Sequence, residues 1–184
     1  MRATVFSSTL TLLLLAGAAA PAAAGGDEGA ALIVQGTMMA PVGEKGRVAD
    51  SYGWGAEVRV VPDDPITMSF GGYAVVGQPD GDKQMRDVYS FVYDIGWQPG
   101  KMRSFRPFLA VGLDVLWVTS RTPGEDALRG TTLGLHARTG IVHAISERWM
   151  AQVTASYLGA IVPGTGDDLG GLVLQAGIGK TFED

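Results

Sequence analysis

Residues 89–97 read Tyr89-Ser90-Phe91-Val92-Tyr93-Asp94-Ile95-Gly96-Trp97. Large apolar or aromatic side chains alternate there with side chains that are mostly small or polar. Because successive side chains of a β-strand point to opposite faces, this alternation predicts a strand with one bulky apolar face. The same alternation returns in residues 109–117, 133–141 and 151–157, and helical periodicity is nearly absent after residue 25. The pattern predicts an all-β chain.

The alternating segments and the breaks between them predict eight strands. Their expected ranges are 30–40, 53–61, 66–76, 86–98, 105–119, 131–145, 148–162 and 169–182. Most exceed the length of about five or six residues usual in soluble proteins and suit a tilted membrane crossing of about 9–11 residues. Tight connections at 62–65 and 146–147 alternate with longer ones at 41–52, 77–85 and 120–130. This sorting of loops is typical of a bacterial outer-membrane barrel, here an eight-stranded antiparallel up-and-down transmembrane β-barrel.

The composition of the two strand faces predicts which of them meets lipid. The polar face is rich in Gly, Ala and Ser, whose small side chains fit the narrow interior of an eight-stranded barrel. The bulky apolar face is therefore expected to point outward into a membrane, whereas a soluble barrel would bury its apolar face. Val61, Val75, Leu116 and Val118 fall in the inward phase and are exceptions to the rule.

Aromatic residues gather at the ends of the predicted strands. With a periplasmic N-terminus, Trp54 and Trp117 fall near the extracellular ends, and Trp97, Trp149 and Phe182 fall near the periplasmic ends. Amphipathic rings favour the boundary between membrane and water. The aromatic positions therefore predict two interfacial girdles and agree with the orientation given by the loop lengths.

The N-terminal segment has the features of a targeting signal. Arg2 precedes an apolar core at residues 10–18, and Ala22-Ala23-Ala24 follow. This order is typical of a secretory signal peptide, residues 1–24, which leaves residues 25–184 as the outer-membrane β-barrel domain. The apolar core is shorter than the roughly 20 residues that a membrane helix needs. The protein is predicted to be exported to the cell outer membrane.

Composition narrows the possible functions. The 184 residues carry 14 Lys and Arg against 19 Asp and Glu, a net charge of −5, which argues against a nucleic-acid surface. The absence of Cys excludes disulfides, thiolate metal sites and cysteine nucleophiles. The acidic pairs Asp80/Asp82 and Asp167/Asp168 lack the ligand spacing of a calcium loop and are interpreted as solvated turns. No metal or cofactor site is predicted.

Six ionisable residues fall in the inward phase of their strands. They are Glu57, Arg59, Asp94, Asp114, His136 and Arg138. Buried charges persist when they are paired, so a salt-bridged plug is favoured over an ion path or a ligand site. A hairpin centred near Glu125 would set Asp114 opposite His136 and diagonal to Arg138. We therefore expect Asp114 to accept a hydrogen bond from Arg138, from His136 or from both.

Three stretches carry a resemblance to a known family. They are Arg106-Pro107-Phe108-Leu109-Ala110-Val111-Gly112-Leu113, then Leu133-Gly134-Leu135-His136-Ala137-Arg138-Thr139-Gly140 with Trp149 after a turn, and Gly177-Ile178-Gly179-Lys180-Thr181-Phe182. They resemble the fifth, the sixth and seventh, and the C-terminal strands of the outer-membrane protein β-barrel family, the OmpA/OmpX-like small barrels. The resemblance implies insertion by the outer-membrane assembly machinery, which reads a terminal aromatic. Here Glu183 and Asp184 follow Phe182, a departure from that pattern.

The leading interpretation is a non-enzymatic integral outer-membrane barrel with an envelope-structural or surface-interaction role. Its expected partners are outer-membrane lipid and lipopolysaccharide, and the loops identify no further partner. A soluble secreted or periplasmic lipocalin-like barrel that binds a small apolar ligand is the alternative. A lipid A-modifying barrel enzyme is a weaker alternative, because it needs a His beside a Ser and an acid near the outer leaflet. His136 falls in the lumen phase and His143 at the periplasmic end, so no catalytic residue is assigned.

Overall fold

The computed structural model describes residues 29–42, 47–61, 65–99, 105–160 and 170–182. The expected signal peptide, residues 1–24, lies outside this part of the chain. Within these ranges no helix is both long enough and apolar enough to cross a membrane.

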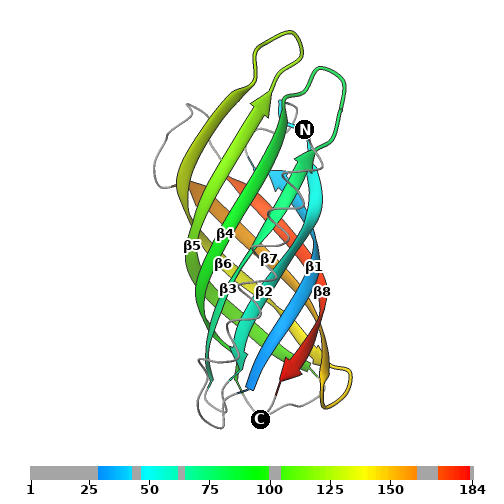
Figure 1. Cartoon of the computed structure of the whole chain (residues 1–184), viewed down its shortest axis with the longest axis vertical. Coiled ribbons are helices and arrows are strands. Elements are labelled where there is room, and N and C mark those ends of the chain that lie inside the picture. Colours follow the sequence, from blue (N-terminus) through cyan, green and yellow to red (C-terminus); the bar gives the residue numbers. More distant parts are fainter. Residues whose placement is uncertain (1–28, 43–46, 62–64, 100–104, 161–169, 183–184) are drawn as a thin grey trace.

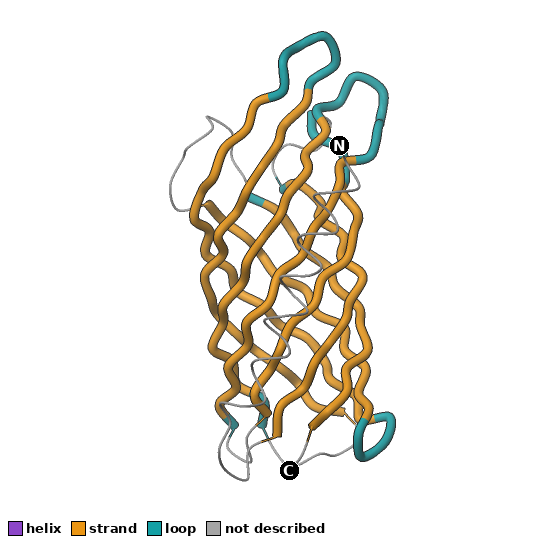
Figure 2. Tube along the Cα trace, viewed as in Figure 1, coloured by secondary structure: helices purple, strands orange, loops and turns teal. Residues whose placement is uncertain are grey.

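Eight antiparallel strands close into one barrel (Figure 1). Their bounds are β1 (Gly29–Pro41), β2 (Ser51–Val61), β3 (Ile66–Gly77), β4 (Met85–Trp97), β5 (Phe105–Arg121), β6 (Leu128–Ala144), β7 (Trp149–Ala160) and β8 (Gly171–Phe182). Each strand pairs with its neighbours in sequence, and β1 closes the ring against β8. Figure 2 shows that the strands run along the molecule while the turns and loops lie at its two ends. The predicted eight-stranded up-and-down barrel is confirmed.

The β5–β6 hairpin is longer than the sequence predicts. β5 runs to Arg121 and β6 begins at Leu128, so the turn covers only residues 122–127 and the predicted long loop over 120–130 is wrong. The hairpin reverses around Gly124, which takes a φ of 84°. Glycine reaches positive φ without the steric cost that a side chain imposes, and this favours the reversal at that position. Gly130 lies in β6, opposite Val118, and not in a loop.

Burial alternates along the strands in the sense opposite to that of a soluble barrel. The outward side chains of Phe91, Leu113 and Val153 are 46%, 50% and 64% exposed, whereas the inward side chains of Asp94 and Asp114 are buried. An apolar exterior around a polar interior is the arrangement of a barrel whose surrounding solvent is lipid. The outward orientation of the bulky face is confirmed. The soluble lipocalin-like alternative, which needs a polar exterior, is wrong.

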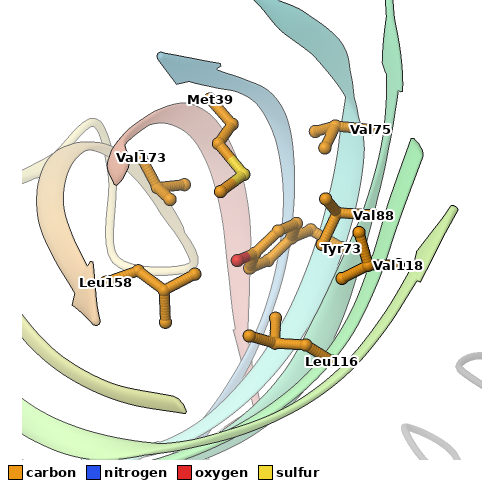
Figure 3. Packing of buried hydrophobic residues seen from close by; sticks show 8 residues of the cluster. All are labelled: Met39, Tyr73, Val75, Val88, Leu116, Val118, Leu158 and Val173. Atoms are coloured by element: carbon orange, nitrogen blue, oxygen red, sulfur yellow. The ribbon is translucent and has the colours of Figure 1, made fainter. Parts of the chain in front are cut away.

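Two apolar clusters occupy the lumen on either side of its middle. The first lies toward the end that carries the 122–127 turn and is shown in Figure 3; it comprises Met39, Tyr73, Val75, Val88, Leu116, Val118, Leu158 and Val173. The second lies toward the opposite end and comprises Ala31, Ile33, Phe108, Ala110, Val142 and Met150. Val75, Leu116 and Val118 therefore break the alternation rule because they pack against one another inside the barrel. The side chain of Val61 lies outside the described ones.

Candidate functional site in the barrel lumen

All six ionisable residues singled out from the sequence face the lumen between the two apolar clusters. Glu57 and Arg59 come from β2, Asp94 from β4, Asp114 from β5, and His136 and Arg138 from β6. Each is buried, with at most 7% of its surface exposed. We call this set the charged belt.

Arg138 connects two sides of the charged belt. Its Nη1 donates to Glu57 Oε2 at 2.6 Å, and its Nη2 forms an ion pair with Asp94 Oδ2 at 2.6 Å. β2 and β6 are four strands apart in the ring of eight, so they face each other across the barrel. The Arg138–Glu57 pair therefore crosses the lumen. A guanidinium presents several donors in a rigid fork, which suits it to hold two carboxylates at once.

Arg59 extends the charged belt toward β7 and β1. It forms an ion pair with Glu57, and its Nη2 donates to Gln152 Oε1 at 2.9 Å. Gln152 Nε2 in turn donates to Gln35 Oε1 at 2.8 Å. The ring of Phe108 lies close to both guanidiniums, with its centre 4.2 Å from the central carbon of Arg59 and 5.0 Å from that of Arg138. Phe108 thus adds a cation–π contact to each arginine.

His136 lies between two carboxylates. Its Nδ1 is 2.6 Å from Asp114 Oδ2, and its Nε2 is 3.5 Å from Asp94 Oδ2. A carboxylate only accepts hydrogen bonds, so Nδ1 donates to Asp114. Ser90 Oγ donates to the other oxygen of Asp114 at 2.8 Å. The charged belt therefore holds three carboxylates, two guanidiniums and one imidazole in mutual contact.

The predicted register between β5 and β6 is wrong by two residues. Asp114 lies opposite Gly134, and His136 lies opposite Gly112. The cause is the reversal at Gly124, one residue before the predicted centre. Asp114 still reaches His136 diagonally, because a shift of two residues keeps both side chains on the inward face. The predicted partner Arg138 instead binds Glu57 and Asp94.

Several polar and aromatic residues of this site were not singled out from the sequence. Phe108, Gln35, Gln152 and Ser90 all contact members of the charged belt or extend its hydrogen bonds. The alternation along each strand did indicate that these side chains point into the lumen. These side chains are uncharged and so carry no sign of a buried ionic site, and parity alone does not say which inward residues meet across the lumen.

A small cavity adjoins the charged belt. It measures about 20 Å³, and its lining includes Asp94, Asp114, His136 and Arg138 together with Tyr73 and Leu158. That volume has room for about one water molecule. Arg138 Nε, His136 Nε2 and Asp94 Oδ1 make no hydrogen bond within the described residues. The cavity and these polar atoms together fit an internal water.

The aromatic residues expected at the membrane boundaries lie on the outer face. Trp97 and Phe182 end β4 and β8, and Trp149 begins β7, all at the same end of the barrel. Trp117 and Trp54 lie toward the other end, where β5 ends and β2 begins. Trp97, Trp117, Trp149 and Phe182 are each more than two-fifths exposed, whereas Trp54 is partly buried.

The acidic turn at residues 80–82 has a local partner. Asp80 Oδ2 accepts from Lys83 Nζ at 2.5 Å, and the hydrogen bond and charge of Asp80 raise the pKa of Lys83. Gly81 takes a φ of 57°, which makes the tight reversal possible. In the part of the chain that the structure describes, no group of three or more His, Asp or Glu could hold a metal ion. Asp167 and Asp168 lie outside the described residues.

A closed eight-stranded barrel with an apolar outer face and a buried charged belt defines a small integral β-barrel of the outer membrane. No known protein family and no curated protein matches the sequence. Solved structures do match the fold.

Neisserial surface protein A is similar with a TM-score of 0.60 and 10% identity, over 86% of this chain and 98% of that one. OprG from Pseudomonas aeruginosa gives a TM-score of 0.61 and 14% identity, over 87% and 99%. Ail, the attachment invasion locus protein of Yersinia pestis, gives a TM-score of 0.58 and 11% sequence identity, over 85% of this chain and 99% of that one. Because the sequence identities are only 10%, 11% and 14%, these similarities support the fold alone.

Proposed function

We propose that this chain is a non-enzymatic outer-membrane barrel whose lumen is plugged by the charged belt. Its envelope-structural or surface-interaction role would then be carried by the outer face and the extracellular loops. The observation that supports this most directly is the Arg138–Glu57 ion pair, which joins opposite walls of the barrel at 2.6 Å. The proposal includes removal of residues 1–24 as a signal peptide. It also includes recognition of Phe182, near the end of β8, by the assembly machinery.

The packing around the charged belt supports a plug over a channel. The belt fills the middle of the lumen, and apolar clusters occupy the lumen on either side of it. The cavity beside it has room for about one water molecule, whereas a conducting path needs continuous water. The charges are paired, as is required of charges that remain buried in a protein interior.

The hydrogen bonds of the lumen give little support to acyl-transfer chemistry. A serine nucleophile must donate to the base that activates it. Ser90 donates to Asp114, and His136 faces Asp114 and Asp94. The second histidine, His143, lies near the C-terminal end of β6, where its ring stacks on the ring of Phe105.

The described parts of two connections support a surface role. Ala49 N–H donates to the Gln84 carbonyl at 2.9 Å, and Gln84 N–H donates to the Arg47 carbonyl at 2.8 Å. These bonds join the β1–β2 connection to the β3–β4 connection. We propose that this end of the barrel is extracellular, so that the joined loops present a preformed surface.

Conductance in planar lipid bilayers tests the plug. We expect the purified barrel to insert without opening a steady conducting state, while a large porin in the same bilayer serves as the positive control. Arg138→Ala should admit water and raise the conductance above that of the unmodified protein. A steady open channel in the unmodified protein would contradict the plug.

A further inference from the structure

Near one end of the barrel, the outer face of β4, β5 and β6 gains charged side chains from one row of paired residues to the next. Tyr89, Trp117 and Thr131 lie side by side on these three strands. Two residues further along each strand, toward the 122–127 turn, Asp87, Thr119 and Arg129 form the next outward row. Because amphipathic rings favour the membrane boundary, the second row lies at the depth of the lipid headgroups.

Two arginines lie on this part of the outer face, Arg129 in the second row and Arg121 one row further on, opposite Met85. Arg121 continues the outward face of β5, and its Nη2 forms an ion pair with Asp87 Oδ1 at 2.6 Å. Its Nε is buried and makes no hydrogen bond within the described residues. Arg129 is exposed and has no acidic partner in the part of the chain that the structure describes. Asp87, Arg121 and Arg129 together form the cationic patch, in which one carboxylate stands against two guanidiniums. Glu125 and Asp126 lie beyond the patch, on the exposed 122–127 turn.

The cationic patch is confined to one sector of the barrel. At the same end, the outward residues of the other described strands are apolar, aromatic or small. They are Met38 and Ala40, Tyr52 and Trp54, Ala74 and Val76, Tyr157 and Gly159, and Leu172 and Leu174. Arg121 and Arg129 lie on the β5–β6 hairpin, which Figure 1 shows projecting at one end of the barrel. The charged outward residues at this end of the described strands are therefore gathered on three neighbouring strands.

We propose that Arg129, with Arg121 beside it, binds a phosphate of lipid A in the outer leaflet. This inference rests on the proposed function, because it requires this end of the barrel to be extracellular. An exposed guanidinium binds a phosphate through two parallel hydrogen bonds. The outward hydroxyls of Thr119 and Thr131 flank Arg129 and add polar groups, and Trp117 one row below packs against the glycolipid.

The test is lipid A binding to the folded barrel in detergent micelles, measured by native mass spectrometry. Loss of one charge-assisted contact should weaken binding of phosphorylated lipid A to the Arg129→Gln variant by about tenfold. Arg129→Lys, which keeps the positive charge, should lose less affinity for phosphorylated lipid A than Arg129→Gln does. Dephosphorylated lipid A should bind the unmodified protein and Arg129→Gln equally weakly. Arg148→Gln, an exposed arginine on the β6–β7 turn, is the matched control and should bind like the unmodified protein.

The possible outcomes distinguish a failure of the phosphate site from a failure of the proposed function. Equal binding by Arg129→Gln and the unmodified protein, or an equal loss in Arg148→Gln, would overturn the phosphate site. Micelles expose both ends of the barrel, so this result does not depend on orientation. Orientation is measured separately by cysteine labelling on cells. If labelling placed the 122–127 turn in the periplasm while the binding difference persisted, lipid A as the source of the phosphate would be wrong.

Discussion

Removal of Arg138 tests the charged belt directly. Its guanidinium contacts Glu57 and Asp94 at 2.6 Å each and lies over the Phe108 ring. Arg138→Met keeps a long side chain but leaves both carboxylates without this cation. Loss of one partner of a buried ion pair costs about 3–5 kcal/mol, because the remaining charge is buried without compensation. We expect Arg138→Met to lower the free energy of unfolding by that amount.

A second substitution should recover part of the loss. Glu57→Gln in the Arg138→Met background removes the carboxylate that has lost one of its two cations, and it keeps a hydrogen-bonding group beside Arg59. The double variant should therefore be more stable than the sum of the two single changes predicts, by about 0.5–3 kcal/mol. Arg148→Met, on an exposed turn, is the control and should change the stability by less than about 0.5 kcal/mol.

Urea titration of the barrel in lipid vesicles measures these differences. Tryptophan fluorescence and the folded band on an unheated gel report the same transition by independent means. Additive effects of Glu57→Gln and Arg138→Met would show that the two residues are not coupled. An Arg138→Met cost no larger than that of Arg148→Met would refute the view that the cross-lumen pair stabilises the barrel.

Three further predictions concern the lipid face, the orientation and the close packing of strands. Leu113→Arg should lower the free energy of unfolding by about 2–4 kcal/mol if the residue lies near the bilayer midplane. Glu125→Arg in the turn should lower it by less than about 0.5 kcal/mol. Equal losses for the two variants by urea titration would contradict the outward assignment of Leu113. A cysteine at Glu125 should react with an impermeant thiol reagent on intact cells, and one at Glu147 only after the outer membrane is opened. The reverse labelling would invert the orientation. Gly112→Ala should cost about 1–3 kcal/mol, because its Cβ would lie 2.2 Å from a carbonyl oxygen of β4. Gly36→Ala should be tolerated, because the nearest atom to its added Cβ is 3.9 Å away. The melting temperature of each variant is measured from the loss of its folded band on a gel. Equal melting temperatures for Gly112→Ala and Gly36→Ala would contradict this packing.

The sequence by itself determined the strands and their two faces. Side-chain alternation is a local property, since residues two apart lie on the same face whatever the strand pairs with. The alternation in residues 89–97 was therefore sufficient to predict β4 and to assign Asp94 to the inward face. The small inward residues Gly112 and Gly134 indicated a narrow interior, and the outward Trp97 and Trp117 indicated the two membrane boundaries.

Only the tertiary structure decided which inward residues meet. A register shift of two residues leaves every side chain on its own face, so parity could not distinguish a hairpin centred at Glu125 from one that reverses at Gly124. Arg138 reaches Glu57, 81 residues earlier in the chain, because closure of the eight strands sets β6 opposite β2. Leu116 likewise finds its apolar partners only inside the closed ring. Ring closure and register depend on contacts between distant segments, and local alternation carries no information about either.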